Sequence, residues 1–569
     1  MRERDAGGPG RFGSAAALVR HELTTLRVLG TSGVVRPYSP RTLARLASTL
    51  RRWGLGPAGG FTSLALRHPD RVGVIDERGE TTWGEIHARS NAIARGLREL
   101  GVGEGDAVAL LCRNHRGFVE GTIAVAKLGA DVLYLNTAFA APQLGEVCGR
   151  EGVVAVVHDE EFDGLVDQAG VRCTRVLGWT DADADGGGGQ AGAGEQVAGE
   201  DGGPGTRPTL DRLAASWPTG DVEPPGRVSR SVILTSGTTG TPKGAARSEG
   251  SFAAGVSLLS RLPLRAGWRS HVAAPLFHTW GWAHLALAML LGTTLVLRRK
   301  FDPEECLRAV AESRSDSLVV IPVMLQRILQ LPPETLDRYD VSSLRVVASS
   351  GSALAGDLGT EWMDRFGDTL YNIYGSTEVA WVTIATPEDL RARPGTAGRP
   401  PHATEVRLYD DAGSAAPAGG SGRIFVGNSM LFEGYTGGGS KDVVDGLMAT
   451  GDVGRFDEGG RLIVEGRDDE MIVSGGENVF PQEVEDCLAR HDAVKEAAAI
   501  GVDDPDYGSR LRAFVVLTAP DAVTEDELRD HVKQNLARYK VPRDIVFLPE
   551  LPRNATGKIL KRELAERAD

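Results

Sequence analysis

The chain has 569 residues, too many for one compact hydrophobic core, so we expect at least two domains. Hydrophobic residues make up 41% of it and charged residues 25%, as in an ordinary soluble globular protein. The net charge of −14 argues against a nucleic-acid-binding protein, which would carry a basic surface.

Cysteine and hydropathy patterns exclude further classes. The five cysteines lie far apart without a CxxC pair, so we expect a cytoplasmic protein with neither a disulfide framework nor a zinc site. The longest apolar stretch begins at Ala283 and has about 15 residues, short of the roughly 20 that a membrane-spanning helix needs. The first apolar run ends at once in Arg20, which excludes a signal peptide.

Residues 1–56 form a basic N-terminal extension with ten arginines and three acidic residues. Leu43, Leu46, Leu50 and Trp53 recur at helical spacing with arginines between them, which predicts an amphipathic helix. Such a helix could make a peripheral contact with an anionic membrane. The alternative, which the sequence favours slightly, is a helix packed on its own catalytic domain with a solvated basic face.

Residues 57–468 alternate between buried strands and helices. Runs rich in Val and Ile, such as 317–321 and 344–348, are each followed by a loop or a helical stretch. Asp302, with Pro303 and Glu305 after it, is a typical helix start. This pattern predicts an α/β fold with largely parallel sheets. The glycine-rich run at about 181–207 cannot bury apolar surface, so we expect a disordered insertion there.

Residues 469–569 form a smaller α+β domain. The runs 497–502 and 511–517 are predicted strands, and Thr524 with Glu527 forms the capping box of a helix that runs towards Leu536. About 100 residues are enough for a small independent core.

The stretch 233–248, ILTSGTTGTPKGAARS, suggests a phosphate site but is not a P-loop. A P-loop needs G-x-x-x-x-G-K-[ST], whereas here Gly237 is followed by Gly240, and Pro242 precedes Lys243. Hydroxyl groups and glycine-exposed backbone N–H groups could still bind an anion in this loop.

Five motifs occur in chain order over residues 60–569: SGTTGTPKG (236–244), YNIYGSTE (371–378), MATGDVG (448–454), GRDDEMIVSGGENVFPQEVE (466–485) and LPRNATGKILKREL (551–564). Together they resemble those of the adenylate-forming superfamily, which includes acyl-CoA synthetases, peptide-synthetase adenylation domains and luciferases. The C-terminal half is most similar to bacterial fatty acyl-CoA synthetases. The resemblance implies a large multi-subdomain N-terminal domain, 57–468, and a small mobile lid domain, 469–569.

The resemblance also implies a site for ATP, Mg²⁺ and coenzyme A. Lys558 would be the catalytic lysine, Thr238 and Glu378 the Mg²⁺ ligands, Asp469 the hinge, and His278 a catalytic or gating residue beside the acyl pocket. His278, Trp280 and Ser349 would line that pocket. The remaining nucleotide- and thiol-binding candidates are Thr235, Ser236, Gly237, Thr238, Thr239, Gly240, Lys243, Ser350, Gly351, Ser352, Asn372, Tyr374, Gly375, Ser376, Thr377, Asp452, Arg467, Ser474, Gly475, Gly476 and Glu477.

The resemblance implies an ATP-dependent acyl-CoA synthetase. A carboxylic acid, expected to be a medium- or long-chain fatty acid, would form an acyl-adenylate and then a CoA thioester. Two alternatives stay open: an acyl-AMP ligase that loads a carrier protein, and an aryl-acid CoA ligase. A binding scaffold without activity would be expected to lack Lys558 or Glu378, and both are present. Monomer and homodimer are both compatible with the sequence.

Overall fold

The computed structural model describes residues 11–181, 207–234, 243–247, 252–354, 357–410, 413–436, 438–474, 477–504, 508–554 and 557–566. For residues 11–20, 246–247, 469, 473–474, 477–478, 503 and 508–509 it describes the backbone alone. The insertion predicted at about 181–207 lies outside the described residues except for its two ends.

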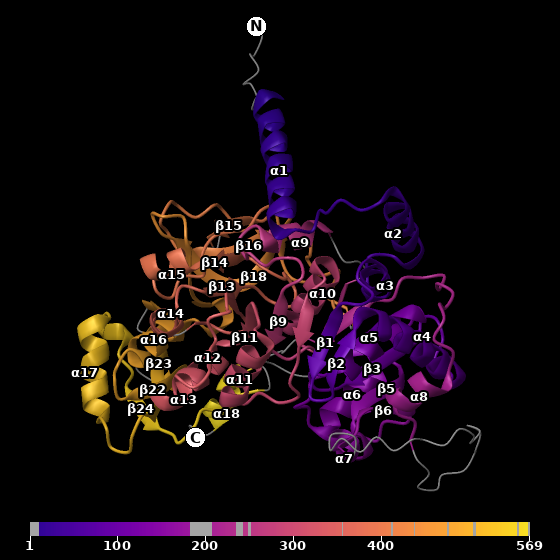
Figure 1. The fold of residues 1–569 in the computed structure, drawn as a ribbon. Helices are drawn as coiled ribbons and strands as arrows, with labels where there is room; N and C mark the ends of the chain where they lie inside the picture. Colours follow the sequence, from indigo (N-terminus) through magenta and orange to yellow (C-terminus); the bar gives the residue numbers. More distant parts are fainter. Residues whose placement is uncertain are drawn as a thin grey trace.

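The largest sheet has eight strands in the order β14-β13-β12-β11-β9-β10-β1-β2 (Figure 1). The six strands from β13 to β1 are parallel, and β14 and β2 are antiparallel at the two edges. The strands predicted at 317–321 and 344–348 are confirmed as β11 and β12. The bounds are β1 Val72–Asp76, β2 Gly79–Thr82, β9 Arg269–Val272, β10 Thr294–Val296, β11 Ser317–Val320, β12 Val346–Ser349, β13 Leu370–Tyr374 and β14 Thr383–Ala385.

A second sheet has six strands in the order β6-β5-β3-β4-β7-β8, parallel except for the β7–β8 pair. Alternate side chains of β3 enter two cores: Val108 and Leu110 pack with α5, and Ala109 and Leu111 pack with α6 and α7. Helices therefore cover both faces, as a parallel sheet requires. The bounds are β3 Ala107–Leu111, β4 Asp131–Tyr134, β5 Val153–Asp159, β6 Thr174–Trp179, β7 Ser231–Leu234 and β8 Gly244–Arg247.

One helix of the large domain begins where its capping residue predicted it. Asp302 accepts a hydrogen bond from the backbone N–H of Glu305 at 2.9 Å, so α11 starts at Pro303 as the sequence indicated. The bounds are α3 Pro57–Arg67, α4 Trp83–Glu99, α5 Arg116–Lys127, α6 Ala141–Arg150, η1 Glu160–Phe162, α7 Asp163–Gln168, α8 Leu210–Ser216, α9 Phe252–Leu259, α10 Thr279–Leu291, α11 Pro303–Ser313, α12 Pro322–Leu329, α13 Pro333–Leu336, α14 Leu358–Phe366 and α15 Pro387–Ala392.

A third, antiparallel sheet follows the large sheet in the chain. Its order is β15-β16-β18-β17, with β19 paired to β18. Its inner face packs on residues that follow β13, among them Val379 and Val382. This packing brings β18 beside the end of β13. The bounds are β15 Glu405–Tyr409, β16 Gly422–Gly427, β17 Val443–Val444, β18 Leu447–Phe456 and β19 Leu462–Arg467.

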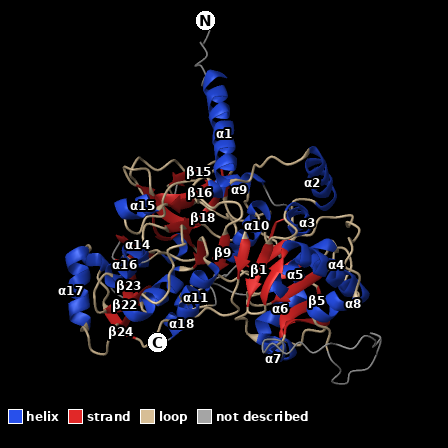
Figure 2. Ribbon diagram, viewed as in Figure 1, coloured by secondary structure: helices blue, strands red, loops and turns tan. Residues whose placement is uncertain are grey.

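The C-terminal part is the predicted α+β unit, at the lower left in Figures 1 and 2. Thr524 and Glu527 form the predicted capping box, and α17 buries Leu528 and Val532 against the sheet. The sheet order is β21-β20-β23-β22, with β24 beside β23. The bounds are η3 Asp468–Glu470, β20 Ile472–Ser474, β21 Glu477–Val479, α16 Pro481–Ala489, β22 Val494–Asp504, β23 Gly508–Leu517, α17 Glu525–Asn535, η4 Arg538–Lys540, β24 Asp544–Phe547 and α18 Lys561–Glu566.

Two helices precede the large domain, α1 (Arg11–Ser32) and α2 (Pro40–Trp53). The predicted amphipathic helix is confirmed as α2. Figure 1 shows α1 projecting from the body. From His21 onward the helix contacts the body: the ring centroids of His21 and His402 lie 4.4 Å apart, Thr25 Oγ1 hydrogen-bonds with His402 Nε2 at 3.3 Å, and Val28 and Leu29 are buried. No helix in the described part of the chain is both long and apolar enough to cross a bilayer.

Candidate active site

Several of the predicted site residues that the structure describes lie at one edge of the eight-stranded sheet. Because β9, β11, β12 and β13 are parallel neighbours, their carboxyl ends lie at the same edge. His278, Ser350 and Ser376 follow three of these ends. Open α/β sheets bind ligands outside the carboxyl ends of their strands, so the topology itself creates a site here.

Tyr374, Asp452 and Arg467 form a hydrogen-bonded group where β13 meets β18 and β19. The Tyr374 hydroxyl donates to the Asp452 carboxylate, and Arg467 Nη1 donates to Asp452 Oδ1 at 3.2 Å. Asp452 and Arg467 are also directly paired across β18 and β19. Strand pairing therefore fixes the position of this carboxylate.

Burial raises the pKa of Asp452, while the charge of Arg467 and the hydroxyl of Tyr374 oppose the rise. Burial beside this carboxylate also raises the pKa of Tyr374 well above its ordinary value. The phenol thus stays a hydrogen-bond donor to the carboxylate.

Glu378 is oriented by two hydroxyl groups. Ser376 Oγ donates to Glu378 Oε2 and the Tyr435 hydroxyl donates to Oε1, each at 2.8 Å. The ammonium of Lys243 lies 5.2 Å from the centre of the Tyr435 ring. A carboxylate held in this way suits a hard cation such as Mg²⁺, which prefers oxygen ligands.

Gly375 is required by a close approach of the backbone. A Cβ atom at this position would lie 2.1 Å from the carbonyl oxygen of Ala380. Only glycine therefore allows the 375–378 loop to fold back onto residue 380 and present its polar side chains.

Ser349 and Asn372 are paired neighbours on β12 and β13, and both are buried. Ser349 Oγ and Asn372 Oδ1 have no hydrogen-bond partner among the described residues. Asn372 and Tyr374 are two residues apart on one strand, so they share a face of the sheet.

Ser350, the residue after β12, already has a hydrogen-bond partner, because its hydroxyl donates to the carbonyl of Ile373 at 2.8 Å. Ser352 is half-buried and Gly351 has a φ of +100°.

His278 caps the N-terminus of α10 and is half-buried. Burial lowers its pKa to about 4, so the imidazole is neutral at physiological pH. Trp280 is buried, and its indole N–H donates to the carbonyl of Val320 at 3.0 Å. The hydroxyl of Thr279 donates to Thr377 at 3.1 Å, which ties the start of α10 to the 375–378 loop.

The Lys558 loop reaches this edge from the C-terminal domain. Lys558 N donates to Asn554 Oδ1 at 3.0 Å, and Arg553 Nη1 donates to the carbonyl of Gly557 at 2.6 Å. A Cβ atom at Gly557 would lie 2.7 Å from Val323 Cγ1 and 2.8 Å from Ile321 Cδ1, so the loop packs closely on the start of α12.

Lys558 lies within electrostatic reach of the Asp452 group. Burial lowers its pKa, Glu470 and Asp452 raise it, and the nearby Arg467 cation lowers it further. A second contact joins the domains, because Gln326 Nε2 donates to the carbonyl of Lys495 at 2.7 Å. The structure therefore has the Lys558 loop docked at the site.

Several predicted residues lie outside the described part of the chain: Thr235, Ser236, Gly237, Thr238, Thr239, Gly240, Gly475 and Gly476. Ser474 and Glu477 are described only as backbone in the β20–β21 hairpin, and Asp469 only as backbone in η3. Tyr435, Thr279 and Glu470 were not predicted. Tyr435 stands in a glycine-rich stretch without periodicity, so only its contact with Glu378 marks it.

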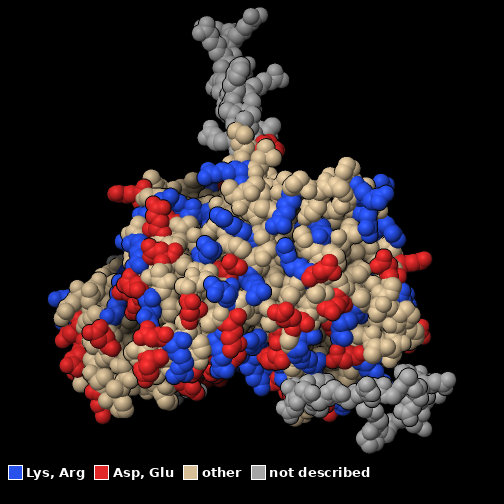
Figure 3. Space-filling view, in the orientation of Figure 1, with Lys and Arg blue, Asp and Glu red and all other residues tan. Residues whose placement is uncertain are grey.

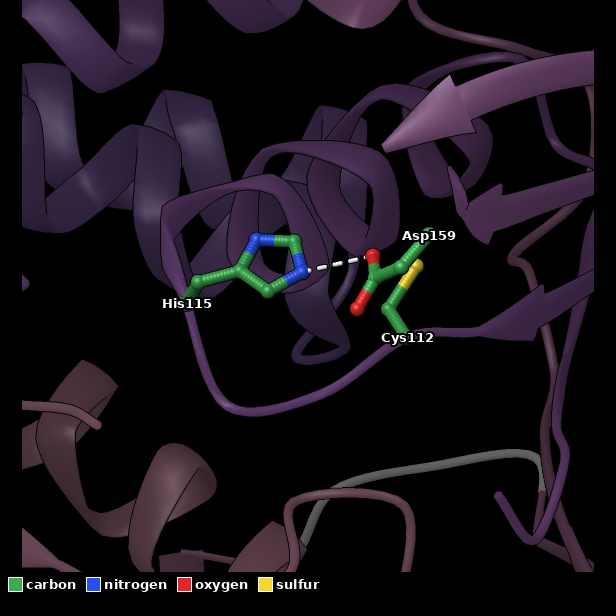
Figure 4. A group of neighbouring side chains, drawn as sticks. All are labelled: Cys112, His115 and Asp159. Atoms are coloured by element: carbon green, nitrogen blue, oxygen red, sulfur yellow. Dashed lines mark hydrogen bonds and ion pairs between the residues drawn. The ribbon is translucent and has the colours of Figure 1, made fainter. Parts of the chain in front are cut away.

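Another group of potential metal ligands lies at the ends of β3 and β5 in the six-stranded sheet. Cys112, His115 and Asp159 are buried with their donor atoms within 4.8 Å of one another (Figure 4). Each already has a partner. His115 bonds Asp159 at 2.8 Å and accepts from Gly117 N–H, and Cys112 donates to a carbonyl at 3.5 Å. Burial raises the pKa of Cys112, which disfavours the thiolate that a metal would need. We interpret the group as a hydrogen-bonded link between β3, α5 and β5.

Comparison with known proteins identifies the same regions. A family model described as "AMP-binding enzyme" matches residues 61–436, and one described as "AMP-binding enzyme C-terminal domain" matches residues 483–558. A feruloyl-CoA synthase of Amycolatopsis sp is 33% identical over 492 residues, which is 85% of this chain and 94% of the relative. A 2-succinylbenzoate–CoA ligase of Geobacillus kaustophilus is 34% identical over 503 residues, 87% of this chain and 95% of the relative.

Among solved structures, the anthranilate CoA ligase AuaEII in complex with anthranoyl-AMP is similar along nearly its whole length. The TM-score is 0.79 at 25% sequence identity, covering 92% of this chain and 99% of that one. The similarity spans both the large domain and the C-terminal domain.

Proposed function

The chain belongs to the AMP-binding enzyme family and is an acyl- or aryl-CoA ligase, and from this premise we propose that its carboxylic acid substrate is aromatic. The observation that carries the proposal is that the three relatives named above are described as acting on ferulate, 2-succinylbenzoate and anthranilate. The fatty acid expected from the sequence resemblance has no such support, whereas the aryl-acid alternative has.

The first half-reaction would use the docked arrangement. A carboxylate oxygen of the acid attacks the α-phosphorus of ATP, and the bond to pyrophosphate breaks. We assign the Tyr374 ring to the adenine, Asp452 and Arg467 to the ribose hydroxyls, and Thr377 to the α-phosphate. Asn372 Oδ1 and Ser349 Oγ have no hydrogen-bond partner among the described residues, and we assign Asn372 to the nucleotide pocket and Ser349 to the acyl pocket. Lys558 would neutralise charge that develops at the reacting oxygens.

Phosphate binding and the metal would be shared by two loops. We assign residues Thr235–Gly240 and Lys243 to the β- and γ-phosphates. The donor chemistry of Glu378 fits Mg²⁺, with Thr238 as the other predicted ligand. The ion would supply charge neutralisation on the phosphate oxygens, and the chain itself orients Glu378 through Ser376 and Tyr435.

The second half-reaction needs a different arrangement. The sulfur of coenzyme A attacks the acyl carbonyl, AMP leaves with the electron pair, and the thiol proton passes to solvent. We propose that rotation at Asp469 removes Lys558 and brings the loop of Ser474, Gly475, Gly476 and Glu477 to the site. His278, Trp280 and Ser350–Ser352 would border the acyl group in both arrangements.

A substrate panel tests the proposal. Purified protein with ATP, Mg²⁺ and coenzyme A would receive ferulate, 2-succinylbenzoate, anthranilate, benzoate, acetate, octanoate or oleate, and CoA-dependent AMP release would be measured. We expect the highest kcat/KM for an aromatic acid. A highest value for octanoate or oleate would overturn the aromatic assignment. Adenylate formation without CoA-dependent turnover would instead favour a carrier-protein acceptor.

A further inference from the structure

The helices before the large domain carry an unusual concentration of exposed apolar side chains. We refer to residues 21–56 as the N-terminal face. Twelve large hydrophobic side chains are exposed among the described residues, and five of them belong to this short segment. These are Leu23, Leu26, Val35, Leu43 and Leu55, with exposed fractions between 47% and 64%.

The apolar side chains of α2 become more exposed from the C-terminal end of the helix to its N-terminal end. Trp53 is buried and packs with Ala58, Ala126 and Val222. Leu50 and Leu46 are half-buried, and Leu43 is 52% exposed. The alternative considered from the sequence, a helix packed on its own catalytic domain, therefore fits only the last turn of α2. In the first turn, Leu43 belongs to no hydrophobic cluster among the described residues.

The arginines of this segment differ from those of the body in their partners. Arginines such as Arg89, Arg116 and Arg261 form ion pairs with carboxylates. The six described arginines of the N-terminal face form no ion pair with any described residue: Arg27, Arg36, Arg41, Arg45, Arg51 and Arg52. Glu22 is the single acidic residue between positions 21 and 56, so this segment is strongly cationic in a protein of net charge −14.

These features lie on one side of the molecule. In Figure 3, blue side chains gather over the α2 corner and beside the foot of α1, whereas red side chains are frequent along the lower left edge. From the exposed apolar stripe and the unpaired cations beside it, we infer that the N-terminal face is a docking surface for an anionic phospholipid bilayer. Leucines would enter the acyl boundary while the arginines face lipid phosphates.

A pocket beside this surface adds to the argument. Its volume is about 200 Å³, and its lining includes Arg51, Arg52 and Arg227 together with Trp53 and Ala126. Guanidinium groups beside apolar side chains complement a phospholipid, whose phosphate would bind the guanidinium groups and whose glycerol and first acyl carbons would contact the apolar side chains. Arg227 is already paired with Asp131 at 2.7 Å, so Arg51 and Arg52 are the cations that would meet the phosphate.

Vesicle co-sedimentation of the full chain tests the inference. The vesicles would contain phosphatidylcholine alone, or phosphatidylcholine and phosphatidylglycerol at three parts to one, in about 0.1 M salt. We expect the protein to bind the anionic vesicles and not the vesicles of phosphatidylcholine alone. Binding should decrease as the salt concentration rises. Each arginine near an anionic surface contributes about fivefold in affinity, so the charge-reversed variant R41E/R45E should bind at least tenfold more weakly.

Matched controls separate this surface from general charge and folding effects. The variant R172E/R490E makes the same change in net charge at exposed arginines elsewhere, and we expect it to bind like the wild type. Leu43→Ser should weaken binding about threefold to fivefold, whereas Val443→Ser, at a side chain 57% exposed in β17, should not. CoA ligase activity in solution should be unchanged in all four variants, which shows that they fold.

Three outcomes would overturn the inference. Equal binding to both kinds of vesicle would remove the electrostatic basis. Release of the protein by millimolar inorganic phosphate would identify the pocket as a site for free anions. Self-association without vesicles, abolished by R41E/R45E, would identify the surface as an interface between copies of this chain.

Discussion

The two halves of the candidate active site are held in place by different means. The half in the large domain is built on strands: Tyr374 ends β13, and Asp452 and Arg467 are paired across β18 and β19. The half in the C-terminal domain is the Lys558 loop, which packs on the large domain at Gly557. The same domain makes a further contact through the hydrogen bond from Gln326 to the carbonyl of Lys495 in β22. A residue fixed by strand pairing keeps its place in both half-reactions, whereas a docked loop can leave. The difference indicates which residues should affect one step and which should affect both.

The largest expected effect is that of Lys558→Ala. Loss of one preorganised cation at the transition state costs on the order of 10²–10³ in rate, or about 3–4 kcal/mol. We expect this loss in kcat for adenylation, measured by pyrophosphate release, more than in ATP binding. Thioester formation from synthetic acyl-adenylate and coenzyme A should stay near the wild-type rate.

Lys533→Ala is the matched control, because this lysine lies exposed on α17 of the same domain. An equal fall of both half-reactions in Lys558→Ala would show that Lys558 serves both steps or is structural, and the contrast between the two halves would fail.

The hinge variant Asp469→Pro should produce the opposite pattern. Proline fixes φ near −65°. If residue 469 must change its backbone conformation between the steps, adenylation should survive while thioester formation falls by roughly tenfold or more. Asp469→Ala leaves φ free and should retain both steps. Equal loss of the two steps in the proline variant would count against this hinge.

Asp452→Asn tests the strand-held half. The carboxylate binds Tyr374 and Arg467, and hydrogen bonds to charged groups contribute about 1.5–3 kcal/mol. We expect roughly a tenfold loss in kcat/KM for both half-reactions, since the adenosine group is present in each. An effect confined to adenylation would mean that this half also rearranges.

The pH dependence of adenylation should report the burial of Lys558. Burial lowers the pKa of this ammonium, so its charge is lost at a lower pH than that of an ordinary lysine. Adenylation should therefore be constant below the lowered pKa and fall about tenfold per pH unit above it, while the protein stays folded. Lys558→Arg should be slower but should not show this decline. A decline that persists in Lys558→Arg would assign the titration to another group.

The smallest expected effect is that of Gln326→Ala, which removes the hydrogen bond to Lys495. A neutral hydrogen bond contributes about 0.5–1.5 kcal/mol, so adenylation should slow about twofold to tenfold. Thioester formation should be unchanged or slightly faster, because the docked arrangement is weakened. Gln330→Ala, at the end of the same helix, is the control, and a fall in both steps would exclude an effect on docking.

The sequence predicted the fold through local signals, and the candidate site residues that it named stay predictions. The starts of α11 and α17 follow from side-chain caps at Asp302 and Thr524, which depend only on neighbouring residues. The motif containing Tyr374 identified the strand end at which the site forms. Tyr435 and Gln326 could not be found in this way, because their roles depend on contacts with residues 57 and 169 positions away. The substrate class was also not predictable, since pocket shape depends on side-chain directions across several strands.

The site draws on three separately packed clusters: that of the large sheets, that of the third sheet, and the cluster of the C-terminal domain that contains Leu551 and Leu564 on either side of the Lys558 loop. Each cluster can unfold locally with its own free energy. Heat inactivation should therefore occur at the temperature at which the least stable of the three clusters unfolds, below the temperature of global unfolding. A nucleotide that touches all three would couple their openings and stabilise them together. With adenylate bound, the three clusters would therefore unfold together at a higher temperature. After its release, each cluster would again unfold at its own temperature.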